Sequence, residues 1–291
     1  MKIVRHLNFL RSIALSLSIV IIVLYSAAVS AAPISFNSAL PVSQGERIVR
    51  ALVNIDRQSV SSDEEQVERD QQSLVSVLGY GINAKWSVFG VIPLQHVSTS
   101  SNNQTQRNTA LGDVEVFSRY EVWRADRQGS TYRVAPFSGA RLPSGELGIS
   151  SDGTTDVFAG LIFSAANIEQ NFDLQLRYER NGNNAEFSAG DTASANFSWQ
   201  KRIAPNKISG DTKGFWFAAL EAELNFMERD RLSGSTLENS GGFRASISPG
   251  IQYITRRWIA EMAIRIPIIN KPNGNAPESE YTVFTGIRAN F

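Results

Sequence analysis

Hydrophobic and polar residues alternate over many segments of this chain, and a period of two residues is typical of a β-strand with one apolar face. Near the C-terminus, for example, Trp258, Met262 and Ile264 share one face, and Glu261 and Arg265 share the other. The same alternation occurs in residues 113–122, 171–179 and 215–226. The last of these segments is rich in Ala, Leu and Glu, which favours a helix, but its strict alternation indicates a strand.

The connections between these segments predict how the strands are arranged. Twelve segments of roughly 10–15 residues follow residue 45, and long and short connections alternate between them. The long connection 57–70 is followed by the short connection 83–84, and then by the long connection 98–109. We therefore expect an all-β fold, a single up-and-down antiparallel transmembrane β-barrel of about twelve strands with short periplasmic turns and long extracellular loops.

The chain ends on one of these alternating strands, and its last residue is aromatic. One face of this strand carries Tyr281, Val283, Thr285, Ile287, Ala289 and Phe291. Termini of soluble domains are usually polar and poorly ordered, whereas a terminal aromatic side chain suits a membrane interface. The strand resembles the C-terminal assembly signal of bacterial outer-membrane barrels, and this resemblance implies recognition by the barrel-assembly machinery.

The positions of the tryptophans support the same topology. In the expected arrangement, all five tryptophans and the last residue lie near the short-turn ends of their strands. Aromatic rings suit the boundary between hydrocarbon and headgroups. The predicted aromatic girdle consists of Trp86, Trp123, Trp199, Trp216, Trp258 and Phe291, and the opposite girdle begins with Tyr178, Phe226 and Tyr281.

The N-terminus has the pattern of a secretory signal peptide. Lys2, Arg5 and Arg11 precede or begin an apolar stretch, and small residues follow it. Cleavage after Ala31 would remove these three basic residues and leave 25 basic and 28 acidic side chains. An uncleaved anchor is the alternative, because the apolar stretch approaches the length of a spanning helix.

The chain therefore divides into three parts. Residues 1–31 form the predicted signal peptide, residues 32–45 form a segment that lies in the periplasm or plugs the lumen, and residues 46–291 form the barrel. This organisation predicts export to the outer membrane of a Gram-negative bacterium. The chain has no cysteine, so no disulfide contributes to its stability.

If the apolar faces contact lipid, the charged faces line the lumen. The predicted lumen-lining residues are Asp113, Glu115, Arg119, Glu121, Arg133, Arg141, Asp173, Arg177, Glu179, Glu221, Glu223, Arg244, Glu261, Arg265 and Arg288. Both signs are present, so we expect ion pairs between neighbouring strands. A barrel of about eight strands is filled by side chains and one of about sixteen encloses a channel. A barrel of intermediate size fits either a narrow polar pore or a lumen filled by ion pairs.

An apolar cargo would gain little from an uninterrupted polar lumen, so it would need an apolar pocket or an opening in the wall. Pro93, Pro136 and Pro249-Gly250 interrupt the strands. Proline and glycine in strands mark bulges, where a wall can open, or simple local curvature. Both interpretations fit the sequence.

A stretch in the middle of the chain resembles a known family. Residues 111–164 include "LGDVEVFSRYEVW", "YRVAPFSGARLPSGE" and "GTTDVFAGLIFS". The resemblance is carried by Gly112-Asp113, Arg119-Tyr120, Pro136, Leu142-Pro143-Ser144-Gly145-Glu146 and Thr155-Asp156. These motifs resemble those of the outer-membrane family labelled MetA-pathway of phenol degradation, which implies transport of aromatic or other hydrophobic compounds. Residues 142–146 are also typical of a turn, because proline fixes φ and glycine tolerates positive φ.

Enzymatic chemistry has little support in the sequence. A resemblance to twelve-stranded outer-membrane phospholipases is limited to His96, Ser98 and either Asn102 or Asn103, and the longer motifs around such a site are absent. Two histidines and no cysteine offer no metal constellation, and no motif indicates a cofactor. The balance of 28 basic and 28 acidic residues does not suggest nucleic-acid binding.

The expected function is passive transport of small molecules, with aromatic or hydrophobic compounds as candidates. A non-conducting barrel that acts through its external loops is the alternative, and a phospholipase-like hydrolase is the third hypothesis. The expected partners are outer-membrane lipid and lipopolysaccharide, the barrel-assembly machinery and periplasmic chaperones during biogenesis, and a small-molecule cargo.

Overall fold

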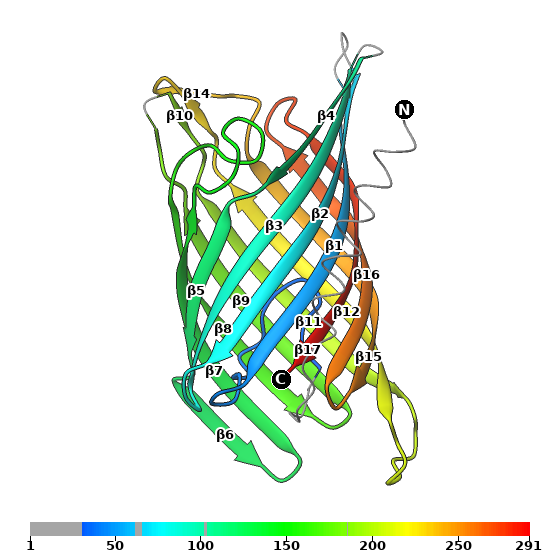
Figure 1. Ribbon diagram of the computed structural model, residues 1–291. Helices are drawn as coiled ribbons and strands as arrows, with labels where there is room; N and C mark the ends of the chain where they lie inside the picture. The colour runs from blue at the N-terminus through cyan, green and yellow to red at the C-terminus, as the bar shows by residue number, and fades with distance from the viewer. Residues whose placement is uncertain (1–30, 62–65, 102–103, 185) are drawn as a thin grey trace.

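The computed structural model describes residues 31–61, 66–101, 104–184 and 186–291. These residues form a closed antiparallel β-barrel, because the sheet order runs from β2 through β1 and β17 round to β3, which pairs again with β2 (Figure 1). The predicted signal peptide lies outside the described residues, except for Ala31. Over the same residues, no helix has the length and apolar character required to cross a membrane.

The barrel strands are β1 (Arg47–Ser61), β2 (Gln66–Gly81), β3 (Trp86–Ser101), β4 (Gln104–Leu111), β5 (Val114–Tyr120), β6 (Trp123–Arg127), β7 (Ser130–Leu142), β8 (Asp156–Asn167), β9 (Gln170–Arg180), β11 (Thr192–Ala204), β12 (Gly214–Met227), β15 (Gly242–Thr255), β16 (Trp258–Pro272) and β17 (Glu278–Asn290). A small separate sheet at the long-loop end contains β10 (Phe187–Ser188), β13 (Arg231–Leu232) and β14 (Ser235–Thr236).

One crossing of the wall is made by three short strands in succession. β4 and β5 both pair with β3, and β5 and β6 both pair with β7, so the three strands follow one line between these neighbours. The first interruption falls at Gly112-Asp113 and the second at Glu121-Val122. Counted in this way, the described strands make the twelve crossings that the sequence predicted, and the all-β barrel is confirmed.

Short turns gather at one end of the barrel and long connections at the other, and the C-terminus lies toward the short-turn end (Figure 1). Two connections predicted as long loops differ, because most of their residues extend the strands. β1 and β2 remain paired as far as Ser61 and Gln66, and β3 and β4 as far as Ser101 and Gln104. The sequences of both hairpin ends are mostly polar, so alternation of apolar and polar residues did not reveal them.

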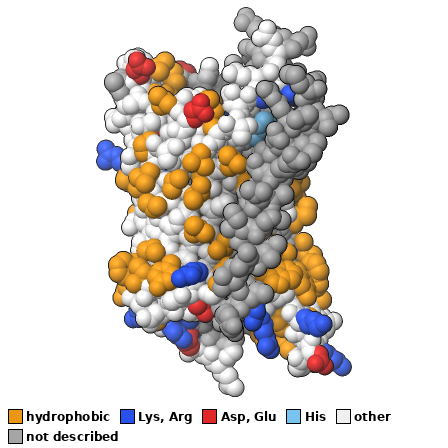
Figure 2. Space-filling model, in the orientation of Figure 1, with side chains coloured by type: hydrophobic (Ala, Val, Ile, Leu, Met, Phe, Trp, Pro, Cys, Tyr) orange, Lys and Arg blue, Asp and Glu red, His pale blue; other side chains and the backbone are white. Residues whose placement is uncertain are grey.

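The outer face of the barrel is apolar. Exposed large hydrophobic side chains on the barrel strands include Leu161, Leu176, Leu220, Ile251 and Met262. Figure 2 shows hydrophobic side chains over the flank of the barrel and charged side chains toward its two ends. A wall with this distribution matches a lipid-spanning barrel, in which every backbone group is paired within the sheet.

The last residue completes the closure of the barrel. The backbone N–H of Phe291 donates to the carbonyl oxygen of Arg47 at 2.9 Å, and the N–H of Arg47 donates to the carbonyl oxygen of Phe291 at 2.9 Å. This pair extends the register of β1 and β17, in which Ile48 lies opposite Asn290. The backbone of Phe291 therefore pairs with the start of β1 and continues the seam between β1 and β17.

The inner face is crowded at β8, where Gly160 allows neighbouring groups to approach. A Cβ atom at this position would clash with the carbonyl oxygen of Leu176 and with the ring of Phe137. Gly90 in β3 lies on the outer face, between the inward-facing Phe89 and Val91, and has no atom within 4 Å of the equivalent position. The two glycines thus occupy the same type of strand with opposite amounts of free space.

We predict that Gly160→Val destabilises the barrel, by about 1–3 kcal/mol or more for overpacking, whereas Gly90→Ala leaves it unchanged. The measurement is the fraction of refolded protein that shows the faster gel mobility of a closed barrel before heating. Equal folded fractions for the two variants would contradict the packing described for β8.

Candidate functional site

A chain segment, residues 31–45, lies inside the short-turn half of the barrel (dark blue in Figure 1). Its main anchor is Glu221 of β12, which is almost fully buried. The carboxylate of Glu221 accepts hydrogen bonds from the N–H of Ile34 at 2.6 Å, and from the N–H and the hydroxyl of Ser35 at 3.1 and 2.6 Å. A buried carboxylate requires such partners, and this one obtains them from the segment.

Side chains of other strands bind the rest of the segment. The hydroxyl of Ser164 accepts from the N–H of Ala39 at 2.7 Å, and the amide of Gln252 donates to the carbonyl oxygen of Ala32 at 2.8 Å. Arg119 donates to the carbonyl oxygens of Ser38 and Leu40. The polar backbone of the segment is therefore paired mainly with side chains of the barrel wall rather than with a sheet.

The apolar side chains of the segment belong to three hydrophobic clusters, the smallest of which joins Ala31 to Phe217, Ile254 and Ile259. Ile34 packs with residues of β1, β12, β16 and β17, and it has no exposed surface. Ala39 and Val42 pack with Phe89, Phe117 and other residues of β3, β5, β7 and β8. Burial of this kind stabilises the segment in the lumen in addition to its hydrogen bonds.

A cavity of about 400 Å³ lies above the segment, toward the long-loop end. One side of its wall is mainly apolar, with Arg50, Arg119 and Arg288 between the apolar side chains. The apolar lining residues on β1, β2, β3, β5 and β17 are Ile48, Leu52, Val75, Val77, Phe89, Val91, Phe117 and Phe284. Residues 35–38 and Leu40 of the segment line the same cavity. The lumen is therefore not uniformly polar, and the pattern of charged residues did not predict this apolar wall.

The other side of the cavity carries a network of ion pairs. Arg141 lies 3.2 Å from Asp156 and 2.5 Å from Glu179. Arg177 lies 2.9 Å from Glu115 and 2.7 Å from Glu179. These side chains come from β5, β7, β8 and β9, so one network joins four neighbouring crossings.

Further pairs occupy the opposite part of the lumen. Arg265 lies 2.8 Å from Glu223, and Arg50 lies 2.6 Å from Glu261. Glu261 also accepts a hydrogen bond from Gln252 at 3.0 Å. The charged interior is therefore built from paired residues of both signs.

Most of the predicted lumen-lining residues are placed inside the barrel. Buried or half-buried on the inner face are Glu115, Arg119, Glu121, Arg133, Arg141, Asp173, Arg177, Glu179, Glu221, Glu223, Arg244, Glu261, Arg265 and Arg288. Asp113 has a different environment, in the interruption before β5, where its carboxylate accepts from the N–H of Gly145 at 2.9 Å. The predicted lumen-lining set did not include Arg50 and Asp156, although the alternation of inward and outward residues places both on the inner face.

The predicted girdle residues lie near the short-turn end. Trp86, Trp123, Trp216 and Trp258 are exposed, and Trp199 and Phe291 are half-buried. The prediction missed Tyr253, whose ring centroid lies 4.9 Å from that of Trp216 and 5.5 Å from that of Trp258. Contact of these rings with membrane headgroups stays a prediction.

The residues of the hydrolase hypothesis, His96 and Ser98, lie in the half of β3 that is nearer the long-loop end. The Nδ1 atom of His96 shares a hydrogen bond with the hydroxyl of Thr109 at 2.6 Å. Ser98 shares the face of His96, and Asn102 and Asn103 lie outside the described residues. The nitrogen that a triad partner would orient is thus occupied by a threonine hydroxyl.

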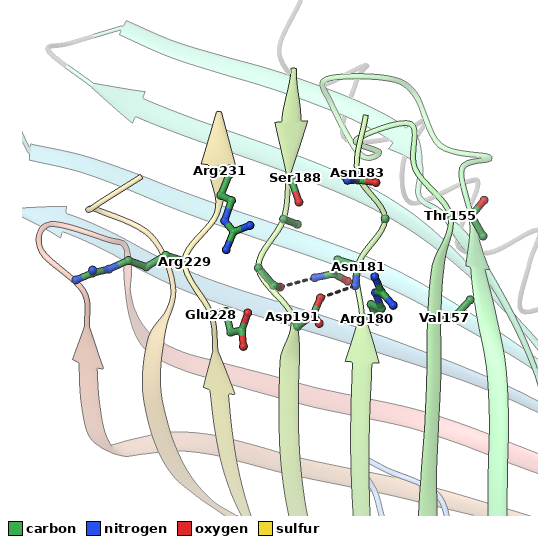
Figure 3. A pocket seen from close by; sticks show the side chains of 13 residues that line it. Thr155, Val157, Arg180, Asn181, Asn183, Ser188, Asp191, Glu228, Arg229 and Arg231 are labelled. Atoms are coloured by element: carbon green, nitrogen blue, oxygen red, sulfur yellow. Dashed lines mark hydrogen bonds between the residues drawn. The ribbon is translucent and has the colours of Figure 1, made fainter. Parts of the chain in front are cut away.

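A second hollow, of about 440 Å³, lies at the long-loop end between the loops that follow β9 and β12. Figure 3 shows the hydrogen bonds that join Asn181 to Gly190 and Asp191, at 2.6 and 3.1 Å. Arg180, Glu228 and Arg231 also line this hollow. It is polar and open at the rim, so we take the lumenal cavity as the candidate site.

Comparison with known proteins agrees with this architecture. The profile of the family described as MetA-pathway of phenol degradation matches residues 56–261. No curated protein matches the chain in sequence. An outer membrane channel from Pseudomonas putida F1 is similar in structure, with a TM-score of 0.68 and 11% identity over 90% of this chain and 100% of that chain. This likeness shows the fold.

Two other solved structures are more distant. The transport unit of the autotransporter AIDA-I from Escherichia coli has a TM-score of 0.47 and 12% identity, over 86% of this chain and 91% of its own. The CymD monoaromatic hydrocarbon channel has a TM-score of 0.43 and 8% identity, over 85% of this chain and 89% of its own.

We predict that Glu221→Ala loosens the segment inside the lumen. Because the chain has no cysteine, Ser38→Cys introduces a single buried thiol whose rate of reaction with a maleimide can be measured. Loss of hydrogen bonds to a charged acceptor should raise this rate about tenfold. Glu223→Ala is the matched control, because Glu223 lies on the same strand and pairs with Arg265 instead of the segment. Equal rates in both backgrounds would show that Glu221 is not the anchor.

Proposed function

The chain belongs to the MetA-pathway of phenol degradation family, and on that premise we propose that it is an outer-membrane barrel for passive transport of small molecules. The observation that supports this proposal is the lumenal cavity, which is enclosed by the barrel wall and floored by residues 35–38 and Leu40. Small-molecule sites in proteins are usually concave and of a few hundred Å³, and the cavity has this size.

The lining of the cavity supports a cargo with an apolar part. Apolar groups gain free energy on leaving water for an apolar surface. Val75, Val77 and Val91 present such a surface on neighbouring strands, with Leu52 and Phe117 beside them. Aromatic or other hydrophobic compounds therefore have a place in the lumen, which a uniformly polar interior would not offer.

Residues 32–45 act in this proposal as a plug. They belong to no strand of the barrel and are held by hydrogen bonds and burial. A segment held in this way can move without breaking the ladders of the sheet, so the pore can open while the barrel stays closed. We propose that conduction depends on displacement of this plug.

The location and partners follow from the same reasoning. The apolar outer face suits the lipid of a Gram-negative outer membrane, with lipopolysaccharide around the long-loop end. We further propose export through a signal peptide cleaved after Ala31, and assembly through recognition of the strand that ends at Phe291, with periplasmic chaperones on the way. No catalytic role is assigned to His96 or Ser98.

A non-conducting barrel is the competing function, and the filled lumen favours it. Several ion pairs and the buried segment occupy much of the interior. If the segment never leaves, the barrel would act only through its external loops. Conductance distinguishes the two functions.

We predict that removal of residues 32–45 raises both the single-channel conductance in planar bilayers and the flux of small aromatic solutes into liposomes. The intact barrel should conduct weakly, because the segment fills the short-turn half of the lumen. A combined Arg119→Ala and Glu221→Ala variant keeps the full chain and should shift conductance in the same direction, since both side chains bind the segment.

The gel mobility of each variant serves as the folding control. Absence of conductance and flux in the intact, truncated and doubly substituted proteins, all correctly folded, would contradict the transport function and favour the filled barrel.

A further inference from the structure

We infer that the lumenal cavity selects small amphipathic anions, namely carboxylates with an aromatic or branched aliphatic body. This inference rests on the proposed transport function and specifies its cargo. The body of the molecule would lie against the valine surface of β2 and β3, and its carboxylate would pair with Arg141. Two properties of the cavity carry the inference, namely its two-sided lining and the different exposure of its cations and anions.

The lining is divided between chemically different strands. The inner faces of β1, β2 and β3 contribute mostly aliphatic side chains, whereas β7 and β9 contribute Arg141 and Arg177. The polar side continues on β11 and β12 with Asn196 and Glu223. A wholly apolar molecule would remove water from the charged side without offering it a polar group, and a wholly polar one would leave the valine surface facing water. A molecule with one apolar and one charged end satisfies both sides.

The sign of the charge follows from the ion pairs. The side chain of Arg141 is 34% exposed, whereas those of its partners Asp156 and Glu179 are 7% and 9% exposed. The same order holds for Arg50 and Glu261, at 12% and 0%. In these pairs the carboxylates are recessed into the wall and the guanidinium groups face the cavity. In the pairs Arg177–Glu115 and Arg265–Glu223 the two partners are about equally exposed. The cavity lining as a whole nevertheless contains more cations than anions, so an incoming molecule meets mainly positive charge: the arginines are Arg50, Arg119, Arg141, Arg177, Arg265 and Arg288, and the carboxylates are Glu115 and Glu223.

The chemistry of the guanidinium group favours carboxylates in particular. Its planar set of N–H donors matches the two oxygens of a carboxylate, and such bidentate pairs are among the stronger hydrogen bonds. Arg141 is the most accessible arginine among the ion pairs of this network. Arg141 of β7 lies opposite Glu115 of β5, and Glu115 lies opposite Val91 of β3. A carboxylate bound to Arg141 would therefore remain close to the apolar side chains of β3.

The test compares probes that share a body or a charge. Binding of benzoate, benzylamine and acetate to the intact detergent-solubilised barrel is measured by calorimetry at pH 7. Benzoate should bind about tenfold more tightly than benzylamine, which carries the opposite charge, and also more tightly than acetate, which lacks the ring. Equal affinities for benzoate and benzylamine would overturn the inference.

Two variants assign the affinity to the two sides of the cavity. Arg141→Gln should weaken benzoate binding about tenfold, and Arg141→Lys, which keeps the charge without the planar donor set, should weaken it less. Val77→Thr, of nearly equal size, should weaken benzoate and leave acetate unchanged. Gel mobility checks folding, and Val77→Thr remains informative if the loss of Arg141 prevents assembly. Unchanged benzoate affinity in folded Arg141→Gln or in Val77→Thr would also overturn the inference.

Failure of this inference differs from failure of the transport function. If the truncated barrel conducts and carries aromatic solutes but shows no preference for benzoate, transport stands and the selectivity is wrong. If no form of the barrel conducts, transport itself is wrong.

Discussion

Pairing of the first strand with the last is the constraint on which the rest of this structure depends. Within a bilayer no water is available for unpaired backbone groups, so a spanning sheet must close on itself. β1 and β17 are far apart in the sequence, and their register runs from Ile48 and Asn290 to Ser59 and Glu278. The closing pair of Arg47 and Phe291 continues this register at the short-turn end. Without this seam, both edges would remain open to aggregation.

Closure also creates the interior that the chain must then occupy. Twelve crossings enclose more space than their own inward side chains fill. The segment 31–45 occupies part of this space. An irregular segment in such a place needs partners for its backbone groups. Glu221, Gln252 and Ser164 supply them from three different strands. The polar inner face is therefore needed for packing as well as for any cargo.

Different interactions hold the wall of the barrel and the segment inside it. Ladders of backbone hydrogen bonds hold the wall, whereas side-chain hydrogen bonds and apolar contacts hold the segment. The ion pairs of Arg141 with Glu179 and of Arg177 with Glu115 link β7 to β9 and β9 to β5, across strands that the backbone ladders already hold in place. They shape the charge of the cavity without being needed to close the barrel. The proposed displacement of the segment would therefore leave the ladders of the wall intact.

The sequence by itself determined the strand period, the number of crossings and the up-and-down arrangement of the strands. These properties depend on local chemistry, because a period of two residues assigns each side chain to one of two faces. It also placed Trp86 and Trp258 at the short-turn end. The ends of β1 to β4 are mostly polar and carry no period, so the sequence predicted loops where the strands continue.

Only the tertiary structure decided what those faces meet. Asp113 belongs to a charged face by alternation, yet it holds the loop at Gly145, because the strand is interrupted beside it. Phe89 and Phe117 point inward like the charged residues near them, and their stacking at 4.7 Å requires two strands to be in register. The segment 31–45 has no hydrophobic period from which its position could be predicted. Its position depends on hydrogen bonds to Glu221, about 190 residues away in the chain. Contacts between strands and across the lumen arise from closure, and a pattern along one strand cannot contain them.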